Sequence, residues 1–332
     1  MLSRPSFVTD DDIAHAVAAH WLPDVAQVSE ITYLPVGFGA HHWRAVAGGR
    51  ALFVTLDQLA PRHTEESLES AYAGAAALAA AGLDLVCPPL ATPSGRLTVP
   101  FHGGALSATP WVVGHTPTEE EAAAPGHVRQ VVAGLAALHG ATPPDGLRPW
   151  SPRVGPTFAE ELERLTARPW ASGPLGEQAR TAMAARSRAI HRWTARYHEL
   201  ARLADAHRDQ WVPTHGEPHH ANQIVTPGGL RLVDWESLAL APRERDYGDL
   251  LEAGTGTGPS PGQGTAPGID TDTDTDTRHL VRYDPAMVEL FALDWRLSEL
   301  DEYARWFCSP HGGTDDDHTA LEGLYEELAA AD

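Results

Sequence analysis

Cysteine is almost absent from this sequence: Cys87 and Cys308 are the two in 332 residues, one in each half. Two isolated cysteines form neither a disulfide framework nor a metal-binding knuckle, and they agree with a reducing compartment. Long apolar runs are also missing, because no stretch approaches the ~18–20 uncharged apolar residues of a membrane span. Residues 1–17 lack an apolar segment of signal-peptide length. We therefore expect a cytoplasmic protein without a membrane segment.

Basic residues are scarce as well, with 24 Lys and Arg against 45 Asp and Glu and a formal charge of −21. A nucleic-acid partner needs a basic patch, so this composition argues strongly against one. A cationic small molecule would instead be attracted by such a field. The acidity is explained equally well by solubility alone, and the composition leaves both readings open.

The strand and helix signals separate along the chain. With 42% apolar residues, 332 residues can bury one large core or two modest ones. The first part predicts strands over 31–36, 41–47 and 51–56, helices over 10–20 and 64–82, and three more short strands between 83 and 114. After Pro125 the pattern is mainly helical, over 126–140, 158–165, 176–210, 285–307 and 319–331, with a small β insertion at 214–236. We therefore predict an α+β chain of two lobes joined near residue 114.

Residues 254–277 form a low-complexity segment of Gly, Pro, Thr and Asp. Such a composition cannot bury apolar surface, so we expect a flexible loop. Its Asp-Thr repeat lacks the glycine and the terminal glutamate of a calcium-binding loop. A solvated segment is therefore the better interpretation.

Three oxygen-bearing side chains stand out in "THGEPHHANQIVTPGGLRLVDWE", residues 214–236. Glu217 is followed by Asn222 five residues later, and Asp234 comes after two short apolar runs around a Gly-Gly turn. Phosphoryl transfer from a nucleotide needs magnesium held by hard oxygen ligands and a residue that orients the attacking hydroxyl. A strand pair over 223–233 would return Asp234 to the side of Asn222, which supplies those groups together.

Zinc is the alternative for this segment. His215, Glu217, His219 and His220 superficially resemble the His-Glu-x-x-His pattern. That pattern needs a helix to bring both histidines to one face, and Pro218 discourages a helix here. Magnesium is therefore favoured.

The segment 214–236 and the following "LALAPRERDYGDLL" (238–251) together resemble the aminoglycoside phosphotransferase family, and within it the spectinomycin-phosphotransferase-like branch. The order of elements is similar from about residue 28 to 325. The resemblance implies a protein-kinase-like fold with a small nucleotide-binding lobe over 1–113, made of an antiparallel sheet and one helix. A larger, mainly helical lobe over 114–332 would carry the catalytic loop 214–236 and the flexible loop 254–277.

The resemblance also implies roles for single residues. Asn222 and Asp234 would be the magnesium ligands, and Glu217 would occupy the place of the family's catalytic Asp. Gly37 and Gly39 would let the backbone approach the nucleotide phosphates. In the segment 109–114, the Pro110 carbonyl and the Val112 N–H would receive the adenine edge.

Two residues depart from the family pattern. Glu217 is one methylene longer than Asp, and a shift of ~1–1.5 Å can cost ~10²-fold in rate. Thr55 stands where the family's phosphate-binding Lys is expected, and a hydroxyl supplies no charge. Arg44 on the preceding strand, or Arg50, would have to supply it instead.

Polar residues elsewhere receive weaker interpretations. His215 is expected to organise its loop by bonding the backbone near Asp234. Asp246 and Asp249 are expected to tie Arg243 or Arg245 at the start of a helix. Three acids of the C-terminal helix are candidates for binding an amine-bearing substrate, with a solvated helix face as the more frequent alternative: Glu299, Asp301 and Glu302.

The sequence thus favours a phosphotransferase that uses Mg²⁺ and ATP or GTP and acts on a hydroxyl of a small molecule, either a cationic antibiotic or a pathway metabolite. Thr55 and Glu217 support an alternative, a kinase-like binding protein that has lost efficient transfer. A peptide Ser/Thr kinase is the third hypothesis. The sequence leaves the oligomeric state open.

Overall fold

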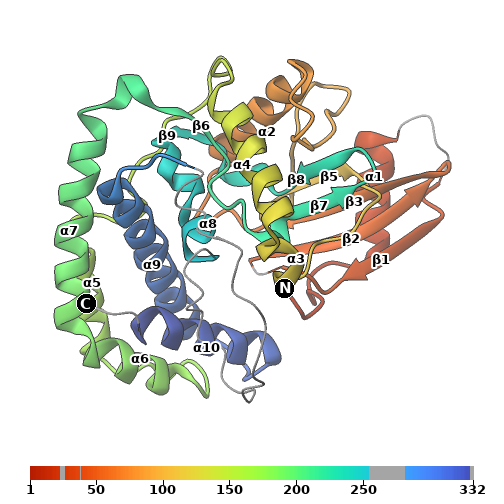
Figure 1. Ribbon diagram of the computed structural model, residues 1–332. Coiled ribbons are helices and arrows are strands. Elements are labelled where there is room, and N and C mark those ends of the chain that lie inside the picture. Colours follow the sequence, from red (N-terminus) through yellow and green to blue (C-terminus); the bar gives the residue numbers. More distant parts are fainter. Residues whose placement is uncertain (23–26, 38, 254–280, 330–332) are drawn as a thin grey trace, which may run out of the picture.

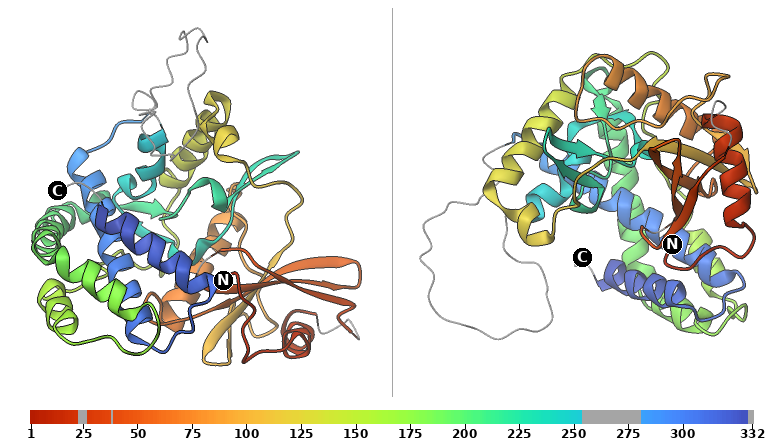
Figure 2. Two further views of the ribbon diagram at one scale, coloured as in Figure 1. Left: turned by 90° about the horizontal axis from the view of Figure 1, so that it is seen from below. Right: turned by 90° about the vertical axis from the view of Figure 1, so that its right-hand side faces the viewer.

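A computed structural model describes residues 1–22, 27–37, 39–253 and 281–329. It is an α+β structure with an antiparallel sheet at the N-terminal end of the chain and a mainly helical remainder, as predicted (Figure 1). Figure 2 shows the same division from two other directions. The segment 254–277, for which we expect flexibility, lies outside the described residues.

Five strands form the N-terminal sheet in the order β1-β2-β3-β5-β4, and all neighbours are antiparallel. Their bounds are β1 Glu30–Leu34, β2 Ala40–Ala47, β3 Arg50–Asp57, β4 Val99–Phe101 and β5 Gly104–Pro110. Burial alternates along β2, because successive side chains of a strand point to opposite faces. Trp43 is buried in a core with Ile13 and Val17 of α1 (Asp10–Trp21). The other face of β2, which includes His42, is turned to the cleft between the lobes.

Helix α2 (Glu65–Ala80) joins the two lobes. Thr64 caps it, since the Thr64 hydroxyl accepts from the Ser67 N–H while the Ser67 side chain accepts from the Thr64 N–H, a reciprocal cap. Its apolar face, with Leu68, shares one hydrophobic cluster with Leu135 and Trp235 of the second lobe. This cluster crosses the boundary that we place at 113/114, and the boundary stays a prediction.

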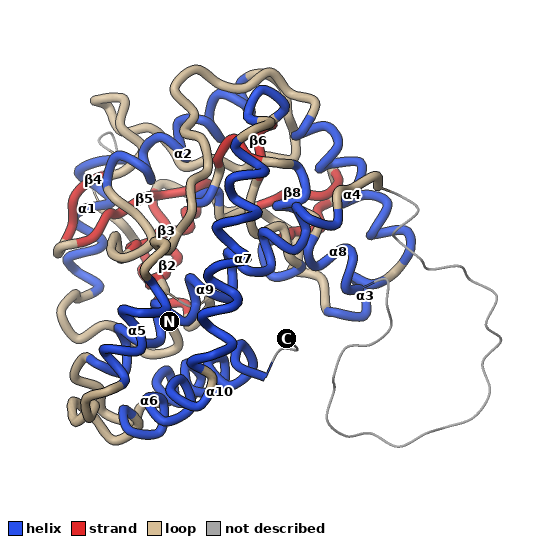
Figure 3. The backbone as a smooth tube through the Cα atoms, turned by 90° about the vertical axis from the view of Figure 1, so that its left-hand side faces the viewer, coloured by secondary structure: helices blue, strands red, loops and turns tan. Residues whose placement is uncertain are grey.

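Eight helices carry most of the second lobe in the described residues. Their bounds are α3 Glu119–Ala123, α4 Pro125–His139, α5 Phe158–Thr166, α6 Gly176–Ala185, α7 Ser187–Asp205, α8 Gly248–Ala253, α9 Pro285–Cys308 and α10 Asp315–Ala329. Helices α7 and α9 lie side by side (Figure 3), and their buried residues Tyr197, Leu297 and Phe307 belong to one core. No helix of the described chain combines the length and the apolar character that crossing a membrane requires.

Four short strands build the site region between the sheet and these helices. Strands β6 (Val212–Thr214) and β9 (Ala239–Ala241) pair with each other, as do β7 (Gln223–Thr226) and β8 (Gly229–Leu232). Three 3-10 turns lie in the same region: η2 (His220–Asn222) precedes β7, η3 (Trp235–Ser237) lies between β8 and β9, and η4 (Arg243–Asp246) follows β9. The predicted strand pair around the Gly-Gly turn is thereby confirmed.

Two of our expectations for secondary structure are wrong. The helix expected over 176–210 is interrupted at Arg186, which has φ −104° and ψ 9°, and a separate 3-10 turn covers Arg208–Gln210. Both α6 and α7 pack against α9, so the break lets each segment bury its own apolar face. Of the three strands expected between 83 and 114, two form, because Val86 makes only a single bridge to Leu232 before Pro88 and Pro89 stop any ladder.

Candidate active site

One large cleft lies between the sheet and the helical lobe. Its volume is about 1340 Å³, more than the ~300–1,000 Å³ of a typical site for one small molecule. Strands β2, β3 and β5 line one wall, and η2, η3 and α9 line the other. The cleft therefore has room for a phosphoryl donor and an acceptor together.

His215 fixes the start of the catalytic loop. Its side chain is fully buried at 0% exposure, and burial lowers its pKa, so the ring is neutral at pH 7. Nε2 donates to the Val233 carbonyl at 2.9 Å, and Nδ1 accepts from the Glu217 N–H at 3.2 Å. The expectation that His215 bonds the backbone near Asp234 is confirmed.

Asp246 holds the same loop from the other side. Its carboxylate accepts from the N–H groups of His215 at 3.1 Å and Gly216 at 2.6 Å, and from His139 Nε2 at 2.8 Å. Burial acts to raise the pKa of Asp246, but the hydrogen bonds from His139 and Gly216 lower it overall. Asp246 thus has the structural role that we expect, but Arg245 forms its hydrogen bonds elsewhere, with the Thr214 hydroxyl and the Ser237 carbonyl.

The glycine at 216 is required by two features. Its φ is +98°, in the left-handed region that L side chains rarely adopt. A Cβ at this position would also collide with the guanidinium of Arg245. The loop can therefore pass over Arg245 only with glycine here.

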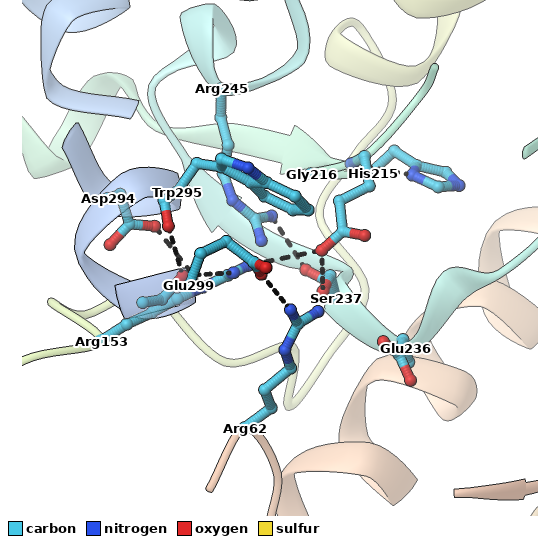
Figure 4. A network of polar contacts seen from close by, with 12 residues as sticks. Arg62, Arg153, His215, Gly216, Glu236, Ser237, Arg245, Asp294, Trp295 and Glu299 are labelled. Carbon is cyan, nitrogen blue, oxygen red and sulfur yellow. Dashed lines mark hydrogen bonds and ion pairs between the residues drawn. The ribbon is translucent and has the colours of Figure 1, made fainter. Parts of the chain in front are cut away.

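Glu217 lies in the cleft and has two polar partners, Ser237 and Arg153, which Figure 4 labels. The Ser237 hydroxyl donates to its carboxylate at 3.4 Å, and Arg153 lies 3.7 Å away. Arg153 also pairs with the buried Asp294 at 3.5 Å. Sequence reasoning missed Arg153, because nothing in "WSPRVGP" indicates a contact with residue 217.

Asn222 and Asp234 are brought to the same end of the β7–β8 pair. The Val233 N–H donates to the Asn222 carbonyl at 3.0 Å, which joins the two segments directly. The Asn222 Nδ2 donates to the Glu217 carbonyl at 2.9 Å, and this leaves Oδ1 for a ligand. Asp234 has φ 65° and ψ 63°, a left-handed conformation that Asp tolerates better than most residues.

Acidic neighbours outweigh the cation next to Asp234, because Glu236 and Glu217 act on its pKa more strongly than Arg62 does. Burial raises the pKa of Asp234 well above its usual value, and the neighbouring Glu236 and Glu217 raise it further. Carboxylate and amide oxygens are the ligands that Mg²⁺ prefers, and a divalent cation would relieve this repulsion. The residues present therefore fit a magnesium ion held by Asn222 and Asp234.

The zinc alternative has no support in the geometry. Across the described chain, no group of three or more His, Cys, Asp or Glu side chains is arranged to hold a metal ion. His215 is turned to Val233, and the rings of His219 and His220 are 6.4 Å apart at their centroids.

Five of the six expected nucleotide-binding residues line the sheet side of the cleft. Gly37 (φ +70°), Gly39 (φ +91°), Thr55, Pro110 and Val112 all belong to its wall. At the end of the segment 109–114, a Cβ at Gly114 would collide with the Val225 carbonyl. Only glycine therefore lets the connection between the lobes pass so close to β7.

Neither arginine proposed to replace the lysine reaches this wall. Arg44 pairs with Glu30 at 2.9 Å and lies over the Trp111 ring, with 5.4 Å from its guanidinium carbon to the ring centroid. It is not among the residues that line the cleft, and Arg50 is exposed at the start of β3. The sequence contains no lysine at all, since its 24 basic side chains are all arginines.

The alternative that Glu299, Asp301 and Glu302 form a solvated helix face is wrong for Glu299 and Glu302. Glu299 is 5% exposed, and Glu299 and Glu302 line the cleft. Both bind Arg62, which reaches across from the loop after β3, with Glu302 at 2.6 Å. Asp301 instead pairs with Arg305 on the same helix at 2.9 Å. Sequence reasoning missed Arg62.

Comparison with known proteins agrees with this geometry. Residues 30–281 match the model of the family described as "Phosphotransferase enzyme family". Protein StrN of Streptomyces griseus is 31% identical over 116 residues, which are 35% of this chain and 28% of that protein. The chain thus covers little more than a quarter of the curated relative that it matches.

Two solved structures have a similar fold at low identity. Spectinomycin phosphotransferase in complex with ADP and spectinomycin gives a TM-score of 0.69 at 14% identity, over 98% of this chain and 95% of that one. Plasmodium vivax ethanolamine kinase gives 0.56 at 12% identity, over 94% and 86%. The resemblance to the aminoglycoside phosphotransferases is confirmed, and this chain belongs to the phosphotransferase enzyme family.

Proposed function

We propose that this protein transfers a phosphoryl group from a magnesium-bound nucleotide, ATP or GTP, to a hydroxyl of a small amine-bearing molecule. The observation that carries the proposal is the placement of Glu217, Asn222 and Asp234 on one wall of the cleft, opposite Gly37 and Gly39. This arrangement puts an acceptor-orienting carboxylate next to hard-oxygen ligands and faces both with a glycine turn.

Glu217 would accept a hydrogen bond from the acceptor hydroxyl and orient its oxygen for attack. Ser237 and Arg153 hold the carboxylate in place, and its backbone is fixed through His215. Asn222 Oδ1 and the Asp234 carboxylate would bind the magnesium ion. When bound, that ion neutralises charge that develops on the transferring phosphate.

The acids of α9 support an amine-bearing acceptor. Glu299 and Glu302 face the cleft and already hold one cation, the guanidinium of Arg62. An acceptor ammonium group arriving beside Glu217 would meet the same two carboxylates. Of the similar structures, one is of a kinase of ethanolamine and one contains spectinomycin, so both compounds are suitable first probes.

A coupled assay of ADP release tests this function. The purified protein is incubated with MgATP and with spectinomycin, ethanolamine or aminopropanol in turn. We expect ADP release that depends on an acceptor and that falls at least ~100-fold in Asp234→Asn. Asp145→Asn, an exposed acid in a loop of the second lobe, is the control and should keep full activity. Equal rates in wild type and Asp234→Asn would contradict the proposal.

A binding protein without transfer is the second candidate, and one observation favours it. The cleft contains Thr55 at the position of the family's lysine, and no lysine exists elsewhere in the chain to replace it. This candidate expects MgATP to raise the melting temperature while no acceptor in a panel of hydroxylated amines stimulates ADP release. Acceptor-dependent release excludes it.

A further inference from the structure

The wall of the cleft opposite the catalytic loop carries an imidazole next to Thr55. His42 of β2 is the direct cross-strand partner of Thr55 in β3, and both line the cleft. If the protein binds a nucleotide as proposed above, the phosphates would lie between this wall and the glycine turn. His42 is therefore a candidate for the contact that a lysine makes in the family.

The ring of His42 is fixed on three sides. Its Nδ1 lies 3.2 Å from the Thr55 hydroxyl oxygen. Its plane is tilted by 32° from the ring of Phe53, with 4.9 Å between centroids. A Cβ on Gly37 would be only 3.2 Å from Nε2, so Nε2 lies directly beneath the glycine turn. A backbone that approaches phosphates at Gly37 would thus bring them to Nε2.

A neutral His42 ring can present its proton in the same direction. Burial and the nearby Met1 ammonium lower the pKa of His42 to about 4, His41 adds to this effect, and Glu236 opposes it. A neutral imidazole carries one proton and accepts at its other nitrogen. When the Thr55 hydroxyl donates to Nδ1, the proton is on Nε2, where it can be donated toward the glycine turn.

We propose that His42 binds the nucleotide phosphates through its Nε2–H in place of the missing lysine, with Thr55 as the positioning residue whose hydroxyl holds the ring at Nδ1. Thr55 then has a function of its own in the cleft wall, besides replacing the positively charged lysine of the family. Because the donor is neutral, the glycine-turn backbone and the divalent ion supply a larger share of phosphate binding than they would beside a lysine.

Calorimetric titration with MgADP and with adenosine tests this contact. His42→Phe keeps a ring against Phe53 but removes the N–H, and we expect the Kd for MgADP to rise about tenfold to a hundredfold. The Kd for adenosine should change less than twofold, which also shows that the variant is folded. His42→Gln restores an N–H donor near Nε2 and should recover most of the affinity.

Thr55→Val isolates the positioning role. It removes the hydroxyl at nearly unchanged shape, so the ring loses the hydrogen-bond partner that holds it at Nδ1, and we expect the Kd for MgADP to rise about threefold to tenfold. Thr32→Val makes the same change at an exposed position of β1 and should leave affinity unchanged. In the double variant His42→Ala, Thr55→Lys, the freed space admits a lysine, which should bind MgADP more tightly than His42→Ala alone.

The outcomes separate this inference from the proposed function. If the wild type binds neither MgATP nor MgADP, the proposed function and this inference both fail. If it binds MgADP and His42→Phe binds it equally well, His42 is not the phosphate contact and only this inference falls. Loss of MgADP affinity in Arg44→Gln without loss in His42→Phe would overturn it too, in favour of Arg44.

Discussion

Arg62 and Glu299 form an ion pair across the cleft, from the loop after β3 to α9 (Figure 4). Glu302 binds the same guanidinium, and the ring of Trp295 lies 5.7 Å from it. The two side chains are 237 positions apart in sequence. The pair therefore connects the sheet lobe directly to the helix that carries the candidate acceptor-binding acids.

Arg62 and Glu299 should be coupled in their contribution to the stability of the protein. Arg62→Gln leaves two carboxylates facing each other, and we expect the free energy of unfolding to fall by about 1–3 kcal/mol, since the pair is only partly exposed. The double variant Arg62→Gln, Glu299→Gln should lose less than the sum of the single variants. Urea denaturation of the four proteins measures the coupling, and additivity within ~0.3 kcal/mol would show that the pair is not coupled.

Asp246 should matter for stability as well as for the catalytic loop. Asp246→Asn replaces one of two charged acceptor oxygens by an amide, so at least one hydrogen bond from His215, Gly216 or His139 is lost. We expect a loss of at least ~2 kcal/mol in unfolding free energy. Because folding lowers the pKa of Asp246, its contribution is present above the unfolded pKa and disappears as pH falls through the folded one. The deficit of the variant should therefore shrink in acid, and a deficit that is constant between pH 7 and pH 3 would contradict this.

Glu217→Asp tests whether Glu217 is a defect or an adapted residue. Aspartate would restore the family's residue type, but its shorter side chain cannot keep both Ser237 and Arg153 at their present distances. We expect kcat to fall about 10–100-fold, with the KM for MgATP nearly unchanged, in steady-state kinetics with any acceptor that the protein accepts. A higher kcat in the variant would show that the loop is built for aspartate.

The catalytic segment could be predicted from sequence because the residues and the turn that define it are close together in the chain. His215, Asn222 and Asp234 lie within twenty residues, the Gly-Gly turn sets the register of β7 and β8, and strand pairing then returns Asp234 to Asn222. The same holds for α1, α2 and the strands β1 to β3, whose periodicity and turns predict them closely. Tertiary packing has little influence on either.

The partners of these residues could not be predicted, since their contacts are remote in sequence. Arg62 meets α9 across 237 positions, and His139 meets Asp246 across 107. No propensity or spacing rule predicts which arginine enters a cleft. The break of the long helix at Arg186 likewise follows from how α6 and α7 pack on α9, which is a tertiary effect.

The pH dependence of stability tests the environment of Asp57, which lies near the acids Asp234 and Glu236. It is buried on β3, accepts from the Tyr72 hydroxyl at 3.3 Å and shares a hydrogen bond with Glu236, which His63 faces at 3.4 Å. Burial raises the pKa of Asp57 well above its usual value, and the nearby Glu236 and Asp234 raise it further. The folded protein thus binds this proton more tightly than the unfolded chain, so stability falls as pH rises from about 4 toward the folded pKa.

Asp57→Asn should remove that pH dependence. The asparagine amide can donate to Glu236 and its carbonyl can accept from Tyr72, so both hydrogen bonds of the protonated acid are kept. We expect the metal-free variant to gain stability relative to wild type as pH rises from 5 to 8, by at most ~1.4 kcal/mol per pH unit. Melting temperatures across this range measure the difference. A variant that is less stable than wild type by the same amount at every pH would contradict this prediction, because it would mean that folding does not raise the pKa of Asp57.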